Sequence, residues 1–205
     1  PKDIVSGDFY WFADKGDYAI IGAIDCTGHG VPGALMTVVG NSLMNHVVNG
    51  LGITEPAEIL TELDIRVKET LNQHGQQNTN DGMDAAICKY DKVKNELTFS
   101  GAKRPLMLFR NKSPMELRGN PFPIGSFQYE GTKKYTQQTL KLEPKDIIYL
   151  FTDGYQDQFG GLIGKKFMIK KMREMLIEIS TLKMADQLLL IEQENLNWTA
   201  APCLV

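Results

Sequence analysis

The chain lacks the features that mark membrane-spanning and nucleic-acid-binding proteins. Its longest apolar runs, such as residues 19–24 and 147–151, fall far short of the ~20 residues that span a bilayer, and no apolar leader opens the chain. Its 22 lysines and arginines against 25 aspartates and glutamates give a formal charge of −3, without a basic block that would follow a phosphate backbone. We therefore expect a domain that contacts neither a membrane nor nucleic acid.

Cysteine is also scarce. Cys26, Cys88 and Cys203 are the 3 cysteines, and the sequence contains neither a CxxC pair nor a cluster of cysteine and histidine. This scarcity excludes a disulfide framework and disfavours a zinc site. A reducing, cytoplasmic location is the expectation that follows.

The remaining composition is that of an ordinary globular protein. The 205 residues are 42% hydrophobic and 23% charged, which fits one domain over residues 1–205. Because a strand-like pattern begins within the first few residues, we expect a piece of a larger protein, with a sensor or regulatory domain upstream in the same polypeptide.

Hydrophobic periodicity predicts the order of strands and helices. Residues 4–12 and 18–25 are rich in β-branched and aromatic side chains around a polar turn, which predicts a hairpin. A first helix is predicted after Pro32 from the apolar positions Leu35, Val38, Val39, Leu43 and Val47. A second helix from about residue 55, a polar loop at 74–82, strands at 83–90, 97–100, 106–110, 115–117, 135–142 and 147–152, and helices at 165–180 and 184–197 follow. Because strands mostly follow strands, the order predicts an α+β fold.

Three aspartates interrupt or end stretches that otherwise favour burial: Asp8, Asp25 and Asp153. Ionised carboxylates at the rim of an apolar core are costly unless they are paired or bind a metal, and no lysine or arginine adjoins any of the three in sequence. A hard cation such as Mg²⁺ or Mn²⁺ would explain all three together. For any one of them, a strand-end turn or a helix cap is the alternative.

The segment 25–34, Asp-Cys-Thr-Gly-His-Gly-Val-Pro-Gly-Ala, joins a strand-end carboxylate to a glycine-rich turn that opens a helix. Glycine at such a turn lets backbone groups approach a ligand closely. The segment lacks the Lys-Ser/Thr ending of a P-loop and the glycine spacing of a dinucleotide-binding fingerprint. Nucleotide binding is therefore a poor fit.

Six short motifs follow one another along the chain: Ser6–Trp11, Asp25–Ala34, Asp81–Ala86, Ser100–Ala102, Phe122–Gly125 and Phe151–Gly154. Together they resemble the successive motifs of the sporulation stage II E (SpoIIE) type of bacterial serine/threonine phosphatase, within the metal-dependent protein phosphatases. The resemblance implies an α/β/β/α sandwich of two antiparallel sheets flanked by helix pairs. It covers almost the whole chain.

The resemblance also implies a metal centre and a reaction. Asp25 would bridge two Mg²⁺ or Mn²⁺ ions, and Asp8, Asp153 and the backbone carbonyl of Cys26 would complete their ligation. Asp157 would help to hold a further, weaker ion. The implied reaction is direct attack of metal-activated water on phosphoserine or phosphothreonine, without a phosphoenzyme.

Two basic residues near these motifs carry open alternatives. Arg104, which follows Lys103, would bind the substrate phosphate through its guanidinium fork, or it is a solvated turn charge. His29 would protonate the leaving oxygen, or it orders the glycine turn. Cys88 is expected to be part of the core.

The resemblance further implies a partner, namely a phosphorylated regulatory protein of the STAS-type anti-sigma-factor antagonist class, with control of a bacterial sigma factor as the output. Homodimerisation stays open. Family members end in a strand with an Asp-Asp pair, whereas no acidic residue follows Trp198. Either Cys203–Val205 would be the remnant of that strand, or the tail is a truncation, an altered end or a chain with further residues. This departure favours the alternative interpretation, a catalytically silent phosphatase-like scaffold.

Overall fold

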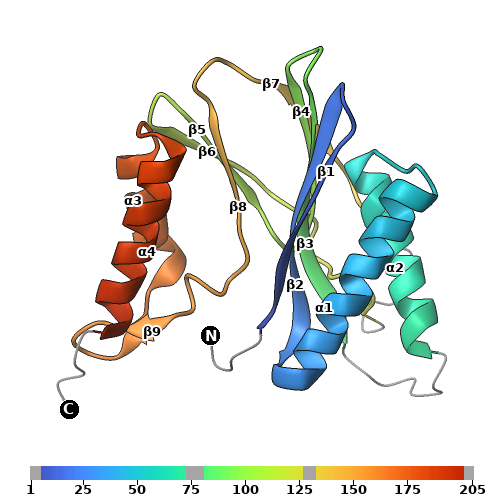
Figure 1. Ribbon diagram of the computed structural model, residues 1–205, viewed down its shortest axis with the longest axis horizontal. Coiled ribbons are helices and arrows are strands. Elements are labelled where there is room, and N and C mark those ends of the chain that lie inside the picture. Colours follow the sequence, from blue (N-terminus) through green and yellow to red (C-terminus); the bar gives the residue numbers. More distant parts are fainter. Residues whose placement is uncertain (1–5, 73–80, 127–132, 201–205) are drawn as a thin grey trace. The chain divides into compact units, whose positions relative to one another are not determined.

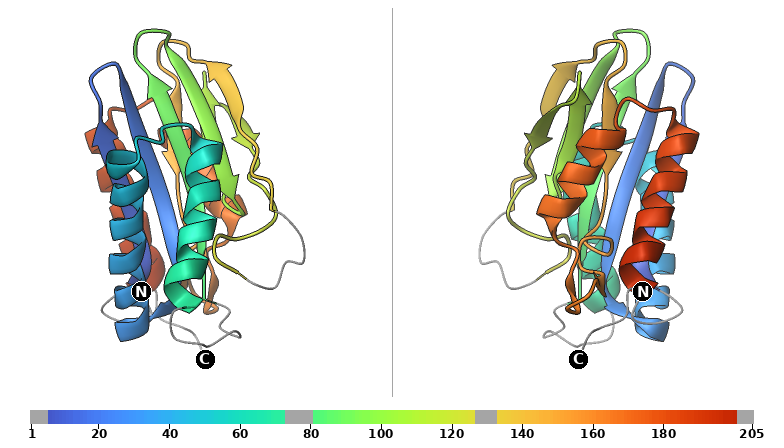
Figure 2. Two further views of the ribbon diagram at one scale, coloured as in Figure 1. Left: turned by 90° about the vertical axis from the view of Figure 1, so that its right-hand side faces the viewer. Right: turned by 90° about the vertical axis from the view of Figure 1, so that its left-hand side faces the viewer.

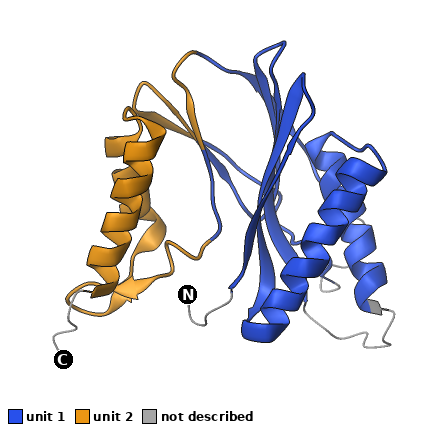
Figure 3. Ribbon diagram, viewed as in Figure 1, with its two compact units in different colours: residues 1–107, 116–143, 149–152 blue, residues 108–115, 144–148, 153–205 orange. Residues whose placement is uncertain are grey.

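The computed structural model describes residues 6–72, 81–126 and 133–200, which belong to two compact units (Figure 3). Unit 1 comprises residues 1–107, 116–143 and 149–152, and unit 2 comprises residues 108–115, 144–148 and 153–205. The expectation of one domain over residues 1–205 remains a prediction.

Unit 1 contains a five-stranded antiparallel sheet in the order β1-β2-β3-β4-β7 (Figure 1). The strands are β1 Ser6–Asp14, β2 Tyr18–His29, β3 Met83–Asp91, β4 Glu96–Ala102 and β7 Gln138–Lys141. The predicted hairpin of β1 and β2 is confirmed. β2 runs past its predicted end at Asp25 to His29, so much of the predicted glycine turn is strand.

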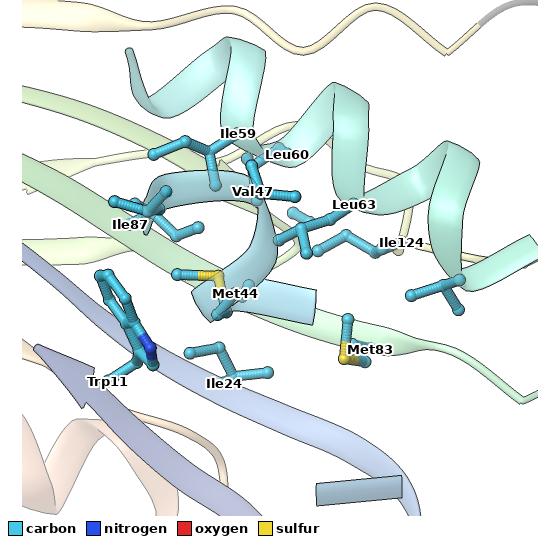
Figure 4. Packing of buried hydrophobic residues seen from close by; sticks show 14 of the residues in the cluster. Trp11, Ile24, Met44, Val47, Ile59, Leu60, Leu63, Met83, Ile87 and Ile124 are labelled. Carbon is cyan, nitrogen blue, oxygen red and sulfur yellow. The ribbon is translucent and has the colours of Figure 1, made fainter. Parts of the chain in front are cut away.

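Two helices lie side by side on one face of this sheet (Figures 1 and 2). They are α1 Gly30–Asn45, which continues into the π-helical turn η1 His46–Gly50, and α2 Pro56–Asn72. In α2, Leu60, Leu63 and Val67 are fully buried, as the helical spacing predicts. The apolar core of unit 1 lies between these helices and the sheet (Figure 4).

The apolar positions that predict α1 do not all lie on its buried face. Leu35 and Val38 are 62% and 67% exposed, while Gly33 and Gly40 are buried. A β-carbon at Gly40 would lie 2.9 Å from the sulfur of Met83 and 3.1 Å from the nearest atoms of the Phe9 ring. The helix packs closely on the sheet through its small residues, and this turns two larger apolar side chains outward.

A buried ion pair ties α2 to the segment that follows Phe122. The Asp64 carboxylate lies 2.7 Å from Lys133 Nζ and 2.6 Å from Lys68 Nζ, and it accepts a hydrogen bond of 2.7 Å from the Gly125 N–H. Lys133 also donates to the carbonyl of Pro123 at 2.7 Å. Burial is the main cause that lowers the pKa of Lys133, although its pairing with Asp64 acts in the opposite direction.

A three-stranded sheet in the order β6-β5-β8 contains residues of both units. Its strands are β5 Leu106–Arg110, β6 Ser113–Leu117 and β8 Ile147–Leu150. The remaining elements, all in unit 2, are β9 Phe159–Gly160, β10 Lys165–Lys166, α3 Met168–Ile179 and α4 Met184–Ala200. The short hairpin of β9 and β10 was not predicted, and it delays the start of α3 relative to the predicted helix at 165–180.

Aromatic side chains hold unit 2 together. The Phe167 ring lies edge-on to the rings of Tyr155 and Trp198, with centroids 5.2 Å apart in both pairs. Trp198 Nε1 donates to the carbonyl of Gln158 at 2.9 Å. Trp198 belongs to α4, while the predicted remnant strand at 203–205 lies outside the described residues.

The predicted α+β class is confirmed, since the described part of the chain combines four α-helices with antiparallel sheets. The predicted polar loop at 74–82 lies mostly outside the described residues. Within the described ranges, none of the helices has the length and apolar character needed to cross a bilayer.

Candidate metal centre

Three aspartates lie opposite one another on neighbouring strands of unit 1. Asp25 of β2 is paired with Asp8 of β1 on one side and with Asp84 of β3 on the other. Directly opposed residues have Cβ atoms about 4.5–5.5 Å apart and point to the same face. Ile24 and Cys26, on either side of Asp25, belong to the core under the helices. Because side chains alternate along a strand, the three carboxylates lie on the sheet face opposite α1 and α2.

Asp84 is a member of this row to which the sequence alone assigned no role. It lies within the motif 81–86 and is the one acidic residue in the run Met83–Cys88. That single charge in a buried strand was the available signal. Its place beside Asp25 depends on the pairing of β2 with β3, and the local pattern of one strand does not encode pairing with a distant one.

The backbone at Gly7 comes so close to Cys26 that only glycine fits. A β-carbon at Gly7 would lie 2.4 Å from the carbonyl oxygen of Cys26 and 3.0 Å from that of Gly28. The register of β1 against β2 shifts at this point, between Ser6 and Asp8. The Cys26 carbonyl, which the resemblance assigns to the metal, therefore lies against the residue that precedes Asp8.

Glycines also bring the start of α1 against this backbone. A β-carbon at Gly33 would lie 2.7 Å from the carbonyl oxygen of Gly28, whose own φ of +103° is rarely adopted by residues with a side chain. The Thr37 hydroxyl donates to the carbonyls of Gly33 at 3.0 Å and Gly7 at 3.2 Å. The glycines of segment 25–34 thus permit close backbone packing beside Asp25.

Two other motifs fix the start of β3 beside this segment. The Thr27 N–H donates to the carbonyl of Gly82 at 2.9 Å, and the Gly82 N–H donates to the Thr27 hydroxyl at 3.1 Å. Met83 and Ile124 exchange backbone hydrogen bonds of 3.0 and 2.8 Å. The motifs at 81–86 and 122–125 therefore hold the strand that carries Asp84.

Arg104 and Lys103 lie against these carboxylates. Arg104 Nη2 forms an ion pair with Asp25 Oδ2 and lies 3.4 Å from Asp84 Oδ2. Lys103 Nζ lies 3.7 Å from Asp84 Oδ1. With 13% of its side chain exposed, Arg104 is not the solvated turn charge of the alternative interpretation. That it binds a substrate phosphate remains a prediction.

A tight turn after β4 fixes the backbone of Arg104. Lys103 has a φ of +59°, its N–H donates to the carbonyl of Asn120 at 2.7 Å, and the Arg104 N–H donates to the carbonyl of Ala102 at 2.7 Å. A β-carbon at Gly101 would lie 2.2 Å from the carbonyl oxygen of Arg104. The glycine of the motif at 100–102 is therefore needed for the turn that directs Arg104 toward the carboxylates.

Cys26 and Cys88 are buried thiols rather than poised nucleophiles. Burial, followed by the charges of Asp25 and Asp8, raises the pKa of Cys26 to about 12. Burial raises the pKa of Cys88 to about 12 as well. Both thiols are protonated at neutral pH, and Cys88 lies in the interior as predicted.

His29 lies at the boundary between β2 and α1. It is exposed and occupies the N-cap position, but its side chain makes no capping hydrogen bond to the helix. Its register partner in β1 is Ser6. The two roles weighed for His29, general acid and organiser of the turn, both remain predictions.

Asp153 and Asp157 belong to unit 2. They lie in the same turn, where the Asp157 N–H donates to the carbonyl of Asp153 at 2.8 Å. The exposed Asp157 carboxylate forms a 2.6 Å ion pair with Lys166. Their assignment as metal ligands remains a prediction.

The oxygen donors of unit 1 fit a hard divalent cation. Asp8 and Asp25 offer two carboxylates on one sheet face, with the Cys26 carbonyl at the glycine contact beside them. Mg²⁺ in proteins is commonly held by one or two carboxylates and keeps several waters. Among the described residues no group of three or more histidine, cysteine, aspartate or glutamate side chains gathers to hold a metal. The aspartates of unit 1 lie in a row across three strands, so Asp8 and Asp84 are two strand spacings apart, roughly 9.5 Å. This separation explains why the three do not form one compact group.

Comparison with known proteins adds independent information. Residues 14–196 match the family model described as Stage II sporulation protein E (SpoIIE). The solved SiaA-PP2C domain of Pseudomonas aeruginosa is similar, with 32% sequence identity and a TM-score of 0.87. That match covers 98% of this chain and 77% of the other chain. No curated protein sequence matches.

Two more distant structures share the fold. The PP2C phosphatase domain of SpoIIE from Bacillus subtilis, solved with a fragment of its regulatory domain, has 17% identity and a TM-score of 0.71, over 95% of this chain and 53% of the other. The RsbU and RsbW domains of Rv1364c from Mycobacterium tuberculosis have 18% identity and a TM-score of 0.69, over 95% of this chain and 51% of the other. The chain thus spans about half the length of either.

Proposed function

The chain belongs to the SpoIIE family of PP2C-type protein phosphatases, and from this premise we propose that it removes phosphate from serine or threonine of a regulatory protein with the help of divalent cations. The observation that carries the proposal is the strand register that sets Asp8 opposite Asp25, with the Cys26 carbonyl at the glycine contact next to them. Like charges directly opposite each other destabilise a strand pair, so a bound cation explains the two opposed carboxylates better than a contribution to the stability of the sheet does.

The proposed ligands in unit 1 are Asp8, Asp25 and the backbone carbonyl of Cys26. Two ions, Mg²⁺ or Mn²⁺, would lower the pKa of a water molecule and offset the charge on the phosphoryl oxygens. The contribution of Asp153 and Asp157 remains the prediction made from the resemblance. All these donors are oxygens, which suits Mg²⁺ and Mn²⁺ better than zinc.

The reaction needs no nucleophilic side chain. The oxygen of water forms a bond to phosphorus while the bond from phosphorus to the serine or threonine oxygen breaks, and the leaving oxygen takes up a proton. The Cys26 thiol, protonated at neutral pH, does not compete as a nucleophile. Arg104 is proposed to donate to the phosphate oxygens, because a guanidinium matches the geometry of phosphate.

The proposed substrate class is a phosphorylated antagonist of an anti-sigma factor with the STAS fold. This part of the proposal rests on the resemblance and on the solved structures that share the fold. They include the phosphatase domain of SpoIIE and part of the chain that contains the RsbU and RsbW domains of Rv1364c. The identity of the substrate is a more specific proposal than the type of reaction. A panel of phosphorylated STAS proteins would test it separately.

A catalytically silent scaffold is the second candidate. The ion pairs of Arg104 with Asp25 and of Lys166 with Asp157 favour it, because each places a basic side chain of the protein on a proposed ligand. In such a scaffold these cations would neutralise the carboxylates permanently. Activity with added cations distinguishes the two candidates.

The test is hydrolysis of p-nitrophenyl phosphate with Mn²⁺ by the unaltered chain and two variants. Asp25→Ala should lower kcat/KM by at least about 100-fold, because it removes the central ligand. Asp14→Ala is the matched control, since Asp14 lies at the opposite end of β1 and pairs with Lys92 on the surface. Equal activity in all three proteins, or none in the unaltered chain, would contradict the proposed reaction.

A further inference from the structure

Asp84 has the most unusual surroundings in the site, and the proposed reaction gives it no role. It lies on the same sheet face as Asp25 and contacts both nearby cations, Arg104 at 3.4 Å and Lys103 at 3.7 Å. The exposed fractions of the Asp84 and Arg104 side chains are 19% and 13%. Asp84 is therefore a largely buried carboxylate within ion-pair distance of two basic side chains, and not a solvated surface charge.

Arg104 spans two carboxylates through one nitrogen. Its Nη2 forms an ion pair with Asp25 Oδ2 and also lies near Asp84 Oδ2. The turn around Lys103 fixes the backbone, so the side chain can move between these two carboxylates without any change of fold. Three carboxylates against two cations leave one net negative charge among these five side chains, which invites a further cation.

A divalent ion at Asp25 and the Arg104 guanidinium compete for the same carboxylate oxygens. At contact distance the repulsion between such cations is large in a partly buried site. Arg104 must therefore leave Asp25 when the ion binds, and Asp84 is the carboxylate that already lies within its reach.

We propose that Asp84 is a positioning residue, which draws Arg104 away from Asp25 when a divalent ion binds and keeps that guanidinium at the site for the substrate phosphate. This inference rests on the proposed function, and it adds a residue and a role to it. Asp84 acts through Arg104 and is not a ligand of the ion. Lys103 Nζ lies 3.7 Å from the other oxygen of Asp84 and adds positive charge there.

The direct test is a double-mutant cycle on Mn²⁺ binding, measured by calorimetry without substrate. Arg104→Gln alone should tighten Mn²⁺ binding a few-fold, because the competing cation is gone. Asp84→Asn alone should weaken it by roughly tenfold, because Arg104 then stays on Asp25. In the Arg104→Gln background the effect of Asp84→Asn should shrink at least about fivefold.

An equal effect of Asp84→Asn in both backgrounds would overturn the proposal, since Asp84 would then act on the ion directly. No effect in either background would overturn it too. The matched control is Asp91→Asn, at the far end of the same strand, where the carboxylate lies 3.6 Å from Lys94 Nζ. Asp91→Asn should leave Mn²⁺ affinity unchanged, and Asp84→Glu should restore most of it.

A second readout follows the phosphate. With p-nitrophenyl phosphate at saturating Mn²⁺, Asp84→Asn should raise KM several-fold while kcat changes less than about twofold. The reason is that Arg104 is proposed to bind the phosphate equally in the ground state and in the transition state, so a misplaced Arg104 weakens substrate binding and not the chemical step. An effect confined to kcat, with KM unchanged, would contradict this role.

A measurement on the unaltered chain covers the case in which Asp84→Asn does not fold. The side-chain NMR signals of Arg104 should shift on saturation with Mg²⁺, because the guanidinium changes partner. They should remain those of a guanidinium ordered by an ion pair. Signals that Mg²⁺ leaves unchanged would overturn the proposal. Failure of the proposed function looks different, because then the unaltered chain would bind neither Mg²⁺ nor Mn²⁺.

Discussion

Gly7 shows how one missing side chain shapes the site. Its Cα lies against the carbonyls of Cys26 and Gly28, at the register shift that precedes Asp8. A methyl group there would meet a backbone atom, which cannot rotate away as the end of a side chain can. Glycine is thus required at position 7 because the backbones of β1 and β2 come so close there. The same close contact places the Cys26 carbonyl oxygen beside the carboxylates.

We predict that Gly7→Ala lowers the free energy of unfolding by about 2–3 kcal/mol and weakens Mn²⁺ binding. Gly16→Ala is the control, because Gly16 has a φ of +77° and a β-carbon added there would meet nothing within 4 Å, so only the backbone conformation costs about 1 kcal/mol. Urea unfolding measures the stability of both variants, and titration with Mn²⁺ measures the binding. A Gly7→Ala protein as stable as the Gly16→Ala protein would show that the close approach is not required.

At the scale of elements, the buried Asp64 joins α2 to the chain segment that pairs with the start of β3. Asp64 holds Lys133 and the Gly125 N–H, and Ile124 exchanges backbone hydrogen bonds with Met83, the residue before Asp84. A helix and a strand of the site are therefore linked by one polar network in the interior. The network is the reason that a charged pair is tolerated there.

We predict that Lys133→Ala lowers the free energy of unfolding by about 2–3 kcal/mol, because it removes the closely held ammonium from a buried carboxylate that keeps Lys68 as a partner. Its neighbour Lys134 is exposed, and Lys134→Ala should cost less than about 0.5 kcal/mol. Thermal and urea unfolding of the two variants give the comparison. Equal stability of the two variants would mean that the Asp64 network does not stabilise unit 1.

The elements also show where sequence reasoning succeeds. The β-branched and aromatic side chains around a polar turn predicted the β1–β2 hairpin, and the second helix, expected from about residue 55, is α2, because both signals are local. Helical spacing also predicted α1, but it does not show that Leu35 and Val38 are exposed, since the close packing of α1 depends on glycines that carry no hydrophobic signal. The role of Asp84 was missed for a related reason, because it depends on the register of distant strands.

At the scale of the whole molecule, the family match spans residues of both units, while the described site lies in unit 1. Asp8 and Asp25 were found from the sequence because a charge that interrupts an apolar strand is a local signal. Their pairing, and the arrangement of Arg104 against them, required the fold. The central claim of this account is that these two opposed carboxylates hold the divalent ion on which hydrolysis depends.

Titration of the chain with Mn²⁺, followed by the EPR signal of the free ion, tests that claim most directly. The unaltered chain and the Asp14→Asn control should take up Mn²⁺ with the same affinity, whereas Asp8→Asn and Asp25→Asn should each bind it at least about tenfold more weakly. An Asp153→Asn arm tests the predicted ligand of unit 2 in the same experiment. If Asp25→Asn binds Mn²⁺ as tightly as the unaltered chain, the claim is wrong.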